Sequence, residues 1–353
     1  MTGAIMTVPS APPRRVLIIK PSSLGDVVTA LPVLRGLRRT FPDAHLAWLV
    51  NAEYAPLLEH DTDLNELIRF DRRDFRGVRR WPVAAVRFVG LMRRLRASHF
   101  DWAIDLQGLL RSGMLSLAGG ASLRAGFARP RENAAGWFYT HRLAVGSAHT
   151  VDRNVELARA LGIDARQEDM TLQVSPAGRG FTQEFMDRHG LRRGGFVVCA
   201  PPTRWSTKLY PVRHWRKVIC ELSRQVPVVL LGGGGREESL CRKIAEGMPA
   251  CVVNLAGRTG IAEMVAVIAS AGAVICSDSA AAFIAQAVGV GTAVLFGPTR
   301  PDRTGPIKTG QAITARLPCQ GCLKRRCRHV TCMESIAPDE VIAAAEKLLA
   351  QRR

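Results

Sequence analysis

Short apolar runs rich in β-branched residues alternate along this chain with longer segments in which apolar residues recur at helical spacing. In the first half, this pattern predicts strands at 16–19, 45–50, 66–70 and 102–106, and helices at 27–40, 52–59, 82–97, 108–118 and 149–161. Strands separated by helices imply a parallel sheet covered on both faces. The pattern weakens at residues 119–130, where Gly, Ala and Arg are mixed.

The alternation repeats more cleanly in the second half. It predicts strands at 196–200, 227–231, 250–254, 273–276 and 292–296, and helices at 211–225, 236–247, 261–271, 279–288 and 338–351. Residues 167–195 are the expected boundary region, with a strand at 169–174, then a loop at 175–180 and a polar helix.

We therefore expect two doubly wound α/β domains facing a cleft, at 1–175 and 176–353, with ligands at the carboxyl ends of the strands. Residues 1–13 are expected to form a flexible tail, and the last helix, 338–351, is a candidate to pack back on the N-terminal domain.

Composition and charge limit the classes of molecule that this protein is expected to bind. The chain has 353 residues, 47% of them hydrophobic, which is ample for two packed cores. Its 49 Lys and Arg against 30 Asp and Glu give a formal charge of +19, which favours a polyanion such as nucleic acid, anionic lipid or a phosphorylated glycan. The N-terminus has no signal-peptide pattern, and no run approaches the roughly 18 apolar residues of a membrane span, so we expect a soluble cytoplasmic protein.

The loop between the first strand and the first helix, residues 20–26, carries the first candidate for chemistry. Small residues let this loop turn sharply, and Asp26 falls at the start of the helix. A carboxylate is favourable there as an N-cap, and on position alone a cap is the simpler interpretation of Asp26.

Several strand ends of the second half carry groups that suit a nucleotide. Residues 203–208 place hydroxyls, a guanidinium and an ammonium in one loop, which favours a diphosphate site or a solvated basic loop. The glycines at 232–235 fit neither a Walker motif nor GxGxxG, so a P-loop NTPase and a dehydrogenase are both disfavoured. Glu237 and Glu238 could bind a ribose or simply favour a helix start, and the helix after Ser279 could bind a pyrophosphate.

Taken in order, six segments resemble the ADP-heptose:lipopolysaccharide heptosyltransferase family (glycosyltransferase family 9). They are the Ser-Leu-Gly-Asp loop at 23–26, Asp-Leu-Gln-Gly at 105–108, Thr-Arg-Trp at 203–205 with Lys208 and Tyr210-Pro211, Leu-Ala-Gly at 255–257, Ser-Asp-Ser at 277–279, and Phe-Gly-Pro-Thr at 296–299. The resemblance runs from about residue 15 to 350. It implies the GT-B fold of two Rossmann-like domains, and an inverting transfer of heptose from ADP-heptose to a lipid-linked lipopolysaccharide core acceptor, with no metal and no cofactor.

The resemblance also implies roles for individual residues. Asp26 would be the general base and Lys208 would face the charge on the departing diphosphate. Donor-binding residues would be Thr203, Arg204, Glu237, Glu238, Thr259, Asp278, Ser279 and Ala280. Acceptor-binding residues would be Ser23, Gly25, Asp105 and Gln107, and no residue would bind a metal. A base must reach its substrate, so we expect the Asp26 carboxylate to face the interdomain cleft rather than fold back onto its own helix.

Two residues depart from the family's pattern and leave alternatives open. Ala280 stands where the family usually has Gly, and Phe283 where it usually has His. One alternative is therefore a glycosyltransferase of the same fold that uses another nucleotide sugar. The other is a non-enzymatic polyanion-binding protein, which only the charge of the chain favours.

Basic residues crowd one region of the first domain, with apolar residues between them. They are Arg72, Arg73, Arg76, Arg79, Arg80, Arg87, Arg93, Arg94 and Arg96. This region is either a solvated helix face or a surface that docks on the anionic inner face of the inner membrane; aromatic residues are too sparse to favour nucleic acid. Near the end, Cys319, Cys322, Cys327 and Cys332 leave open a structural metal, a local disulfide or free thiols.

Overall fold

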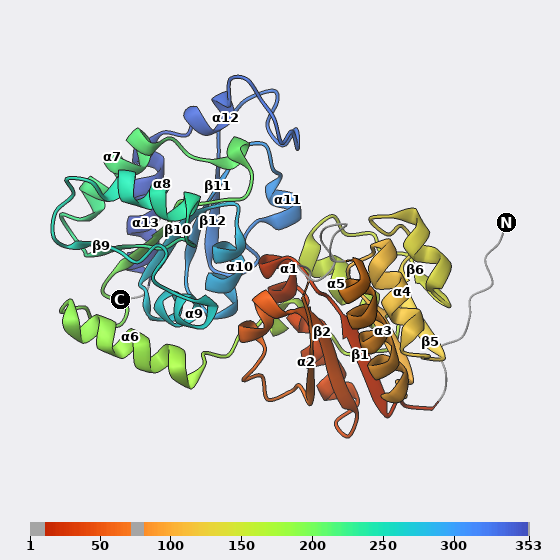
Figure 1. The fold of residues 1–353 in the computed structure, drawn as a ribbon. Helices are drawn as coiled ribbons and strands as arrows, with labels where there is room; N and C mark the ends of the chain where they lie inside the picture. Colours follow the sequence, from red (N-terminus) through yellow and green to blue (C-terminus); the bar gives the residue numbers. More distant parts are fainter. Residues whose placement is uncertain (1–10, 72–80, 352–353) are drawn as a thin grey trace. The chain divides into compact units, whose positions relative to one another are not determined.

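The computed structural model describes residues 11–71 and 81–351, and it divides into two compact units, Met1–Met170 and Thr171–Arg353. Each unit holds one six-stranded sheet in which every strand pair is parallel (Figure 1). The predicted doubly wound α/β architecture is therefore confirmed. Residues 72–80 and most of the N-terminal tail predicted at 1–13 lie outside the described residues.

The sheet of the first unit has the strand order β3-β2-β1-β4-β5-β6. Its strands are β1 (Arg15–Ile19), β2 (His45–Asn51), β3 (Glu66–Phe70), β4 (Trp102–Asp105), β5 (Leu123–Phe127) and β6 (His141–Leu143). Its α-helices are α1 (Leu24–Val28), α2 (Leu31–Thr40), α3 (Trp81–Ala97), α4 (Leu110–Ala118) and α5 (Thr150–Arg159). Short 3-10 helices lie at η1 (Ala52–Leu57), η4 (Asn133–Phe138) and η5 (Gln167–Asp169).

Three expectations for the first unit and the boundary that follows it are wrong in detail. The single helix expected at 27–40 is two helices, with Pro32 in the first turn of the second. The helix expected at 52–59 is the 3-10 helix η1, which contains Pro56. The strand expected at 169–174 does not form: residues 167–169 are the 3-10 helix η5, and the residues after it, where Leu172 N donates to Ala287 O, belong to neither sheet.

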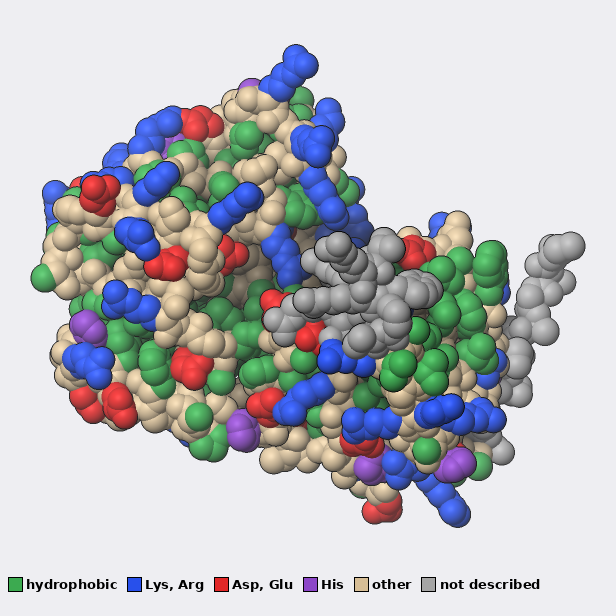
Figure 2. All heavy atoms as spheres, viewed as in Figure 1, with side chains coloured by type: hydrophobic (Ala, Val, Ile, Leu, Met, Phe, Trp, Pro, Cys, Tyr) green, Lys and Arg blue, Asp and Glu red, His purple; other side chains and the backbone are tan. Residues whose placement is uncertain are grey.

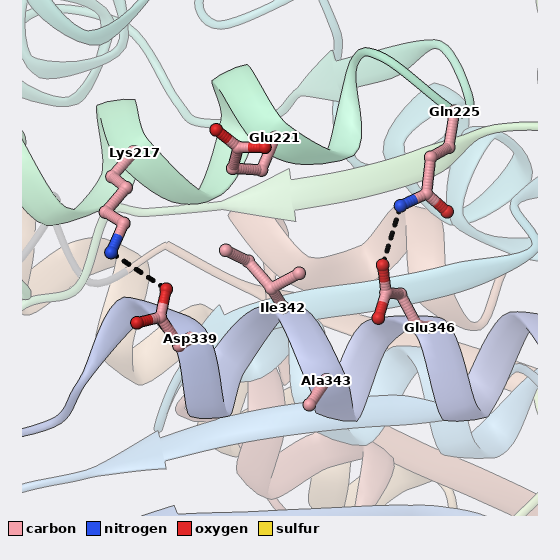
Figure 3. A pocket seen from close by; sticks show the side chains of 7 residues that line it. All are labelled: Lys217, Glu221, Gln225, Asp339, Ile342, Ala343 and Glu346. Carbon is pink, nitrogen blue, oxygen red and sulfur yellow. Dashed lines mark hydrogen bonds and ion pairs between the residues drawn. The ribbon is translucent and has the colours of Figure 1, made fainter.

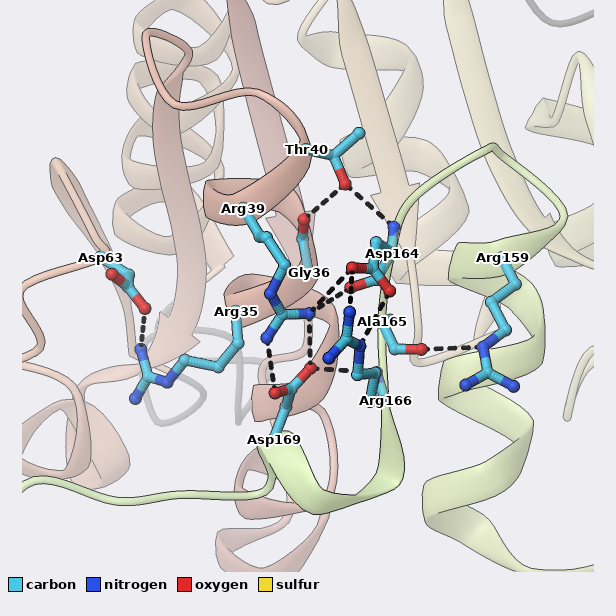
Figure 4. A network of polar contacts seen from close by, with 10 residues as sticks. All are labelled: Arg35, Gly36, Arg39, Thr40, Asp63, Arg159, Asp164, Ala165, Arg166 and Asp169. Atoms are coloured by element: carbon cyan, nitrogen blue, oxygen red, sulfur yellow. Dashed lines mark hydrogen bonds and ion pairs between the residues drawn. The ribbon is translucent and has the colours of Figure 1, made fainter.

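Helices cover both faces of the first sheet. On one face α3 and α4 enclose a core that includes Ile19, Leu49 and Leu115. On the other face α2 packs beside α5 and η5, and a close approach of Gly36 to Ala165 brings them together. Arginines of α2 hold this side to neighbouring loops: the Arg39 guanidinium lies 2.6 Å from Asp169 Oδ1 (Figure 4).

The second unit repeats the same strand order, β9-β8-β7-β10-β11-β12. Its strands are β7 (Val197–Ala200), β8 (Val228–Leu230), β9 (Val252–Asn254), β10 (Ala273–Ser277), β11 (Thr292–Phe296) and β12 (Gly310–Thr314). Its helices are α6 (Pro176–Arg188), α7 (Val212–Leu222), α8 (Arg236–Ala245), α9 (Ile261–Ser270), α10 (Ala280–Ala287), α11 (Pro301–Thr304), α12 (Thr331–Glu334) and α13 (Pro338–Ala350), with the 3-10 helix η6 at Ser206–Lys208.

The last helix, α13, packs on α7 and on strands β10, β11 and β12 of its own unit. Its packing on the N-terminal domain stays a prediction. A shallow groove of about 390 Å³ separates α7 from α13, and it is bridged by a Lys217–Asp339 ion pair at 2.8 Å (Figure 3). Gln225 donates to Glu346 across the same groove at 2.6 Å, so these four polar side chains are paired across the groove.

Candidate active site

In each sheet the chain adds its first three strands in one direction from the centre and its last three in the other, so the strand order reverses at one point. In the first unit the loops after β1 and β4 diverge there, and in the second unit the loops after β7 and β10 do so. In open α/β sheets, a crevice for ligands forms at this point, outside the carboxyl ends of the strands. Two residues expected to take part in the reaction lie just after such strands: Asp26 is in α1, which follows β1, and Lys208 ends η6, which follows β7.

In the first unit the two diverging loops are bonded to each other. Lys20 Nζ donates to Leu106 O at 2.6 Å, and Ser22 N donates to Gln107 Oε1 at 3.4 Å. Lys20 is buried, and this burial lowers the pKa of its ammonium, while the nearby Asp26 carboxylate acts in the opposite direction. Sequence reasoning missed Lys20, because the chain alone does not reveal a partner 86 residues away.

The Asp26 carboxylate caps the helix on which it lies. Its Oδ2 accepts hydrogen bonds from Ser23 N at 2.9 Å and from Ser23 Oγ at 3.0 Å. The expectation that this carboxylate would not fold back onto its own helix is therefore wrong, since a carboxylate satisfies the free amides at a helix start. Within the described part of the chain, no residue donates a hydrogen bond to the other oxygen, Oδ1.

Asp105 is fully buried and already saturated with donors. Oδ1 accepts from the amides of Gln107 and Gly108, and Oδ2 accepts from Ser112 Oγ at 2.7 Å and Tyr139 Oη at 2.6 Å. Burial raises the pKa of Asp105, and these four hydrogen bonds act against that rise. All four lone pairs of this carboxylate already accept hydrogen bonds, so an acceptor sugar could not donate to it. The expected contact of Asp105 with the acceptor is therefore wrong, and Asp105 instead holds the loop of Gln107 and Gly108 in place.

The remaining acceptor candidates lie around the Asp26 loop. Ser23 precedes α1 and is half-buried, Gly25 is buried inside α1, and Gln107 is buried with its side chain against the loop. The structure thus brings Ser23, Gly25, Asp26 and Gln107 together, with Asp105 behind them. Tyr139, which sequence reasoning also missed, anchors this assembly from the segment between η4 and β6.

In the second unit, Lys208 and Asp278 join the two diverging loops. Lys208 Nζ donates to the backbone carbonyl of Asp278 at 2.7 Å and lies 3.1 Å from its Oδ2. Both side chains are largely withdrawn from solvent, at 13% and 7% exposure. The ammonium is therefore fixed at the entry to α10, where the first-turn amides of the helix point outward.

A tryptophan completes this cationic cluster. Lys208 Nζ lies 5.0 Å from the centre of the Trp205 ring, and the Arg325 guanidinium lies 4.7 Å from the same centre. Arg325 comes from the cysteine-rich segment near the C-terminus, which is held to this loop by a hydrogen bond from Thr207 Oγ1 to Lys324 O at 3.0 Å. The sequence pattern gave no signal that this segment returns to the strand end of β7.

The other donor candidates fall into two groups. Thr203 and Arg204 lie in the same loop as Lys208, and Ser279 and Ala280 begin α10 next to Asp278. The second group lies at the ends of β8 and β9. There Glu237 accepts from Gly233 N at 2.8 Å, and the loops are joined by a hydrogen bond from Gly257 N to Gly232 O at 3.0 Å.

Glu238 and Thr259 belong to this second group. Glu238 pairs with Arg242 at 2.7 Å one turn later, and its carboxylate lies against Gly257, two residues before the half-buried Thr259. The predicted donor residues therefore share one edge of the sheet, spread along the four adjacent strands β10, β7, β8 and β9.

The cysteine-rich segment shows no disulfide. Cys319 and Cys322 are exposed, Cys327 is half-buried and Cys332 is buried, and all four are free thiols. Backbone amides of Val330 and His329 lower the pKa of the Cys327 thiol. Across residues 11–71 and 81–351, no three His, Cys, Asp or Glu side chains are arranged to hold a metal ion.

Two parallel sheets of identical strand order, each with polar side chains at its point of reversal, define a two-domain α/β protein with the GT-B fold. The chain belongs to glycosyltransferase family 9 (heptosyltransferase), whose sequence model matches residues 88–332. It is 31% identical to lipopolysaccharide heptosyltransferase 1 of Pseudomonas aeruginosa over 89% of this chain and 88% of that protein. The resemblance noted from the sequence is confirmed.

Solved structures agree on the fold. A family 9 glycosyltransferase of Veillonella parvula superposes with a TM-score of 0.81 at 21% identity, covering 96% of this chain and 97% of that one. Heptosyltransferase WaaC of E. coli, solved with ADP, gives a TM-score of 0.75 at 24% identity, covering 96% and 100% of the two chains.

Proposed function

We propose that this protein transfers a heptose from ADP-heptose to a lipid-linked lipopolysaccharide core acceptor. The observation that carries the proposal is the Lys208–Asp278 contact at the start of α10, in a chain that belongs to a heptosyltransferase family. A fixed ammonium beside outward-pointing helix amides is suited to the two negative charges of a nucleoside diphosphate. A relative of this fold, WaaC of E. coli, has been solved with ADP and with ADP-2-deoxy-2-fluoro heptose, which supports an ADP-linked donor.

In the proposed reaction Asp26 is the general base. Its Oδ1 takes the proton of the acceptor hydroxyl as the hydroxyl oxygen attacks the anomeric carbon, and the bond from that carbon to the diphosphate oxygen breaks. Attack from the face opposite the leaving group inverts the anomeric configuration. Lys208 and the first amides of α10 stabilise the charge that collects on the departing ADP, which is the role that we assign to them in place of a divalent cation.

The surrounding residues of the first unit position this base. Lys20, Gln107 and Asp105 fix the loop that precedes α1, so Ser23 and Asp26 keep their places when an acceptor arrives. Among the described residues no helix is long and apolar enough to cross a bilayer. Because a lipid-linked acceptor stays in its membrane, we place the protein peripherally on the cytoplasmic side of the inner membrane.

A transfer assay tests the proposal. The purified protein, incubated with ADP-heptose and a lipid-linked core acceptor, should release ADP and add one heptose to the acceptor by mass spectrometry. The anomeric configuration of the product, read by NMR, should be opposite to that of the donor, and a chelator should leave the rate unchanged. Release of ADP without any gain in acceptor mass would contradict the proposed acceptor, and retention of configuration would contradict the mechanism.

A same-fold transferase with another nucleotide sugar is the second candidate. It is favoured by Ala280, whose methyl group adds bulk where the family usually has glycine, and by Phe283, which is 7% exposed and offers no polar group. Thermal shifts measured with ADP-, UDP- and GDP-linked sugars separate the two candidates. Stabilisation by ADP-heptose above the other donors supports the first, whereas stronger stabilisation by a different nucleotide sugar supports the second.

A further inference from the structure

The helix α4 buries Leu115 in the core and yet exposes two other leucines on its outer side. Its inward positions include Ser112, Gly113 and Ser116, all buried, whereas Leu110 and Leu117 are 40% and 48% exposed. The two leucines are seven residues apart, so they share one face of the helix. This outer face of the helix is therefore an apolar surface that a partner outside the unit can cover.

Neighbouring elements extend this apolar face. Val86 and Val89 of α3 are 72% and 45% exposed, and Trp137 of η4 is 77% exposed. The elements are in close contact: Gly113 of α4 leaves no room for a side chain against Ala135 of η4, and α3 packs on α4. Of the six large hydrophobic side chains that are exposed among the described residues, five lie on these three elements, which makes chance scatter a poor explanation.

The charge of the same surface is mainly positive, although Arg94 forms an ion pair with Glu66 at 2.8 Å. Neither α3 nor α4 contains an acidic residue. Exposed arginines lie between and around the apolar positions, at Arg87, Arg93, Arg94, Arg96, Arg111, Arg129, Arg131 and Arg142. The acidic Glu132 nearby is engaged in accepting a hydrogen bond from Leu110 N at 2.7 Å. Figure 2 shows hydrophobic and basic side chains together on the face of the first unit where Figure 1 draws α3 and α4.

We propose that this docking face, made by Val86, Val89, Leu110, Leu117 and Trp137 with the arginines around them, lies on an anionic phospholipid bilayer. Exposed aliphatic side chains enter the boundary between headgroups and acyl chains, a tryptophan sits at the level of the headgroups, and arginines pair with lipid phosphates. Phosphate contacts alone would suit a nucleic acid, but aliphatic side chains have no role on one.

The docking face also lies next to the loop that precedes Asp26. Leu110 begins α4 three residues after Gln107, which holds the loop of Asp26. Docking would therefore bring the base close to the membrane surface where a lipid-linked sugar is found. This purpose rests on the proposed function, but the contact with lipid can be measured without donor or acceptor, so either idea can fail alone.

Sedimentation with vesicles tests the docking face. Vesicles of phosphatidylethanolamine and phosphatidylglycerol should bind the full-length protein, and vesicles of phosphatidylcholine should bind it much more weakly. Trp137→Ser, or Leu110→Ser with Leu117→Ser, should each lower the vesicle affinity about tenfold or more, as expected when buried apolar side chains are removed. Arg93→Gln with Arg111→Gln should lower it about tenfold at low salt and less at high salt.

Matched variants on the second unit serve as controls. Leu323→Ser removes the sixth exposed apolar side chain, and Arg188→Gln with Arg192→Gln removes two exposed arginines; neither should change vesicle binding. Circular dichroism and the melting temperature show whether each variant is folded. Equal binding by the Trp137 and Leu110/Leu117 variants would overturn the proposal. So would a dimer or larger assembly of the wild type that these variants dissociate, because the face would then be covered by a second copy.

Discussion

Lys208 Nζ donates to the backbone carbonyl of Asp278 at 2.7 Å and lies 3.1 Å from its carboxylate, so a single ammonium joins the loops that follow β7 and β10. A carbonyl and a carboxylate hold the charge in place before any donor binds. In a site that stabilises a leaving group, such fixed charges are effective because they need no reorganisation during the reaction.

Lys208→Gln should therefore lower kcat for heptose transfer about 100-fold or more, the scale seen when one donor of an oxyanion site is removed. Lys217→Gln is the matched control: this lysine is exposed on α7 and pairs with Asp339. Steady-state kinetics of ADP release give both values. Equal rates for the Lys208→Gln variant and the wild type would remove Lys208 from the mechanism.

Asp26 has two separable roles, as cap and as proposed base. Asp26→Asn keeps a side-chain oxygen that can still accept from Ser23, but it cannot take a proton. We expect kcat to fall about 100- to 10,000-fold while the free energy of unfolding changes little. Asp26→Ala should lose the same activity and also about 1 kcal/mol of stability, because the cap is gone. Transfer kinetics and urea unfolding of the two variants measure the two roles separately. A fully active Asp26→Asn variant would contradict the role as base and leave Asp26 with the capping role alone.

Tyr139→Phe should lower the free energy of unfolding by an amount that depends on pH. Burial raises the pKa of Asp105, and the Tyr139 hydroxyl opposes this by donating to its carboxylate. A hydrogen bond to a charged group contributes about 1.5–3 kcal/mol and one to a neutral group about half of that. The loss of stability should therefore grow as pH rises through the raised pKa of Asp105 and the folded-state carboxyl ionises.

The direction of this pH dependence agrees with the linkage between proton binding and folding stability. A carboxyl with a raised pKa in the folded state loses its proton more readily when unfolded, so stability falls as pH rises from its ordinary value to the raised one. Removing Tyr139 raises the pKa of folded Asp105 further, so the fall in stability extends to higher pH and becomes larger. Tyr210→Phe is the control, because Tyr210 Oη donates at 2.9 Å to a backbone carbonyl that does not titrate. Urea unfolding over a pH series measures both, and parallel curves for the two variants would contradict the prediction.

Arg325 tests whether the cysteine-rich segment contributes to the donor site. Its guanidinium shares the Trp205 ring with Lys208. Losing an exposed cation–π contact costs about 0.5–1 kcal/mol, so Arg325→Gln should raise the donor KM on the order of threefold with a smaller change in kcat. The exposed neighbour Arg326 provides the control substitution, Arg326→Gln, which should leave KM as it is.

Gly36 permits the packing of α2 on the end of the first unit. A Cβ at this position would lie 2.8 Å from the Ala165 Cα, so Gly36→Ala should destabilise the protein by about 1–3 kcal/mol. At Gly90 of α3, nothing lies within 4 Å of an added Cβ, and Gly90→Ala should instead stabilise by about 0.5–1 kcal/mol. Melting temperatures of the two variants test this contrast. Equal shifts in melting temperature would show that helix propensity, and not the space for a Cβ, determines the effect of both substitutions.

Much of the fold follows from the spacing of apolar residues. The strand predicted at 292–296 is β11, a compact apolar run that is buried throughout, and that at 66–70 is the edge strand β3, whose apolar Leu67, Ile68 and Phe70 stand beside Glu66 and the exposed Arg69. The three strands that were missed are the weak ones. β6 has three residues at a sheet edge, β12 is an edge strand that starts with exposed Gly310 and Gln311, and β5 contains Gly126, above which the Tyr139 ring lies.

The candidate site was predictable only in part. Strand-end loops drew attention to the segments of Asp26, Lys208 and Asp278, and the family resemblance supplied the roles predicted for these residues. Their exact partners were not, since the contacts of Lys20 with Leu106 and of Thr207 with Lys324 join residues 86 and 117 positions apart. Long-range pairs of this kind leave no periodic trace in a single sequence.

Each of the two sheets is built from one uninterrupted stretch of chain, with strands β1–β6 at 15–143 and β7–β12 at 197–314. Replacing one stretch by that of a relative would break no strand pairing in the other. Recombination between related genes could therefore exchange one unit and keep the other, and if the proposed donor and acceptor sites are correct, the two specificities would evolve as separate modules.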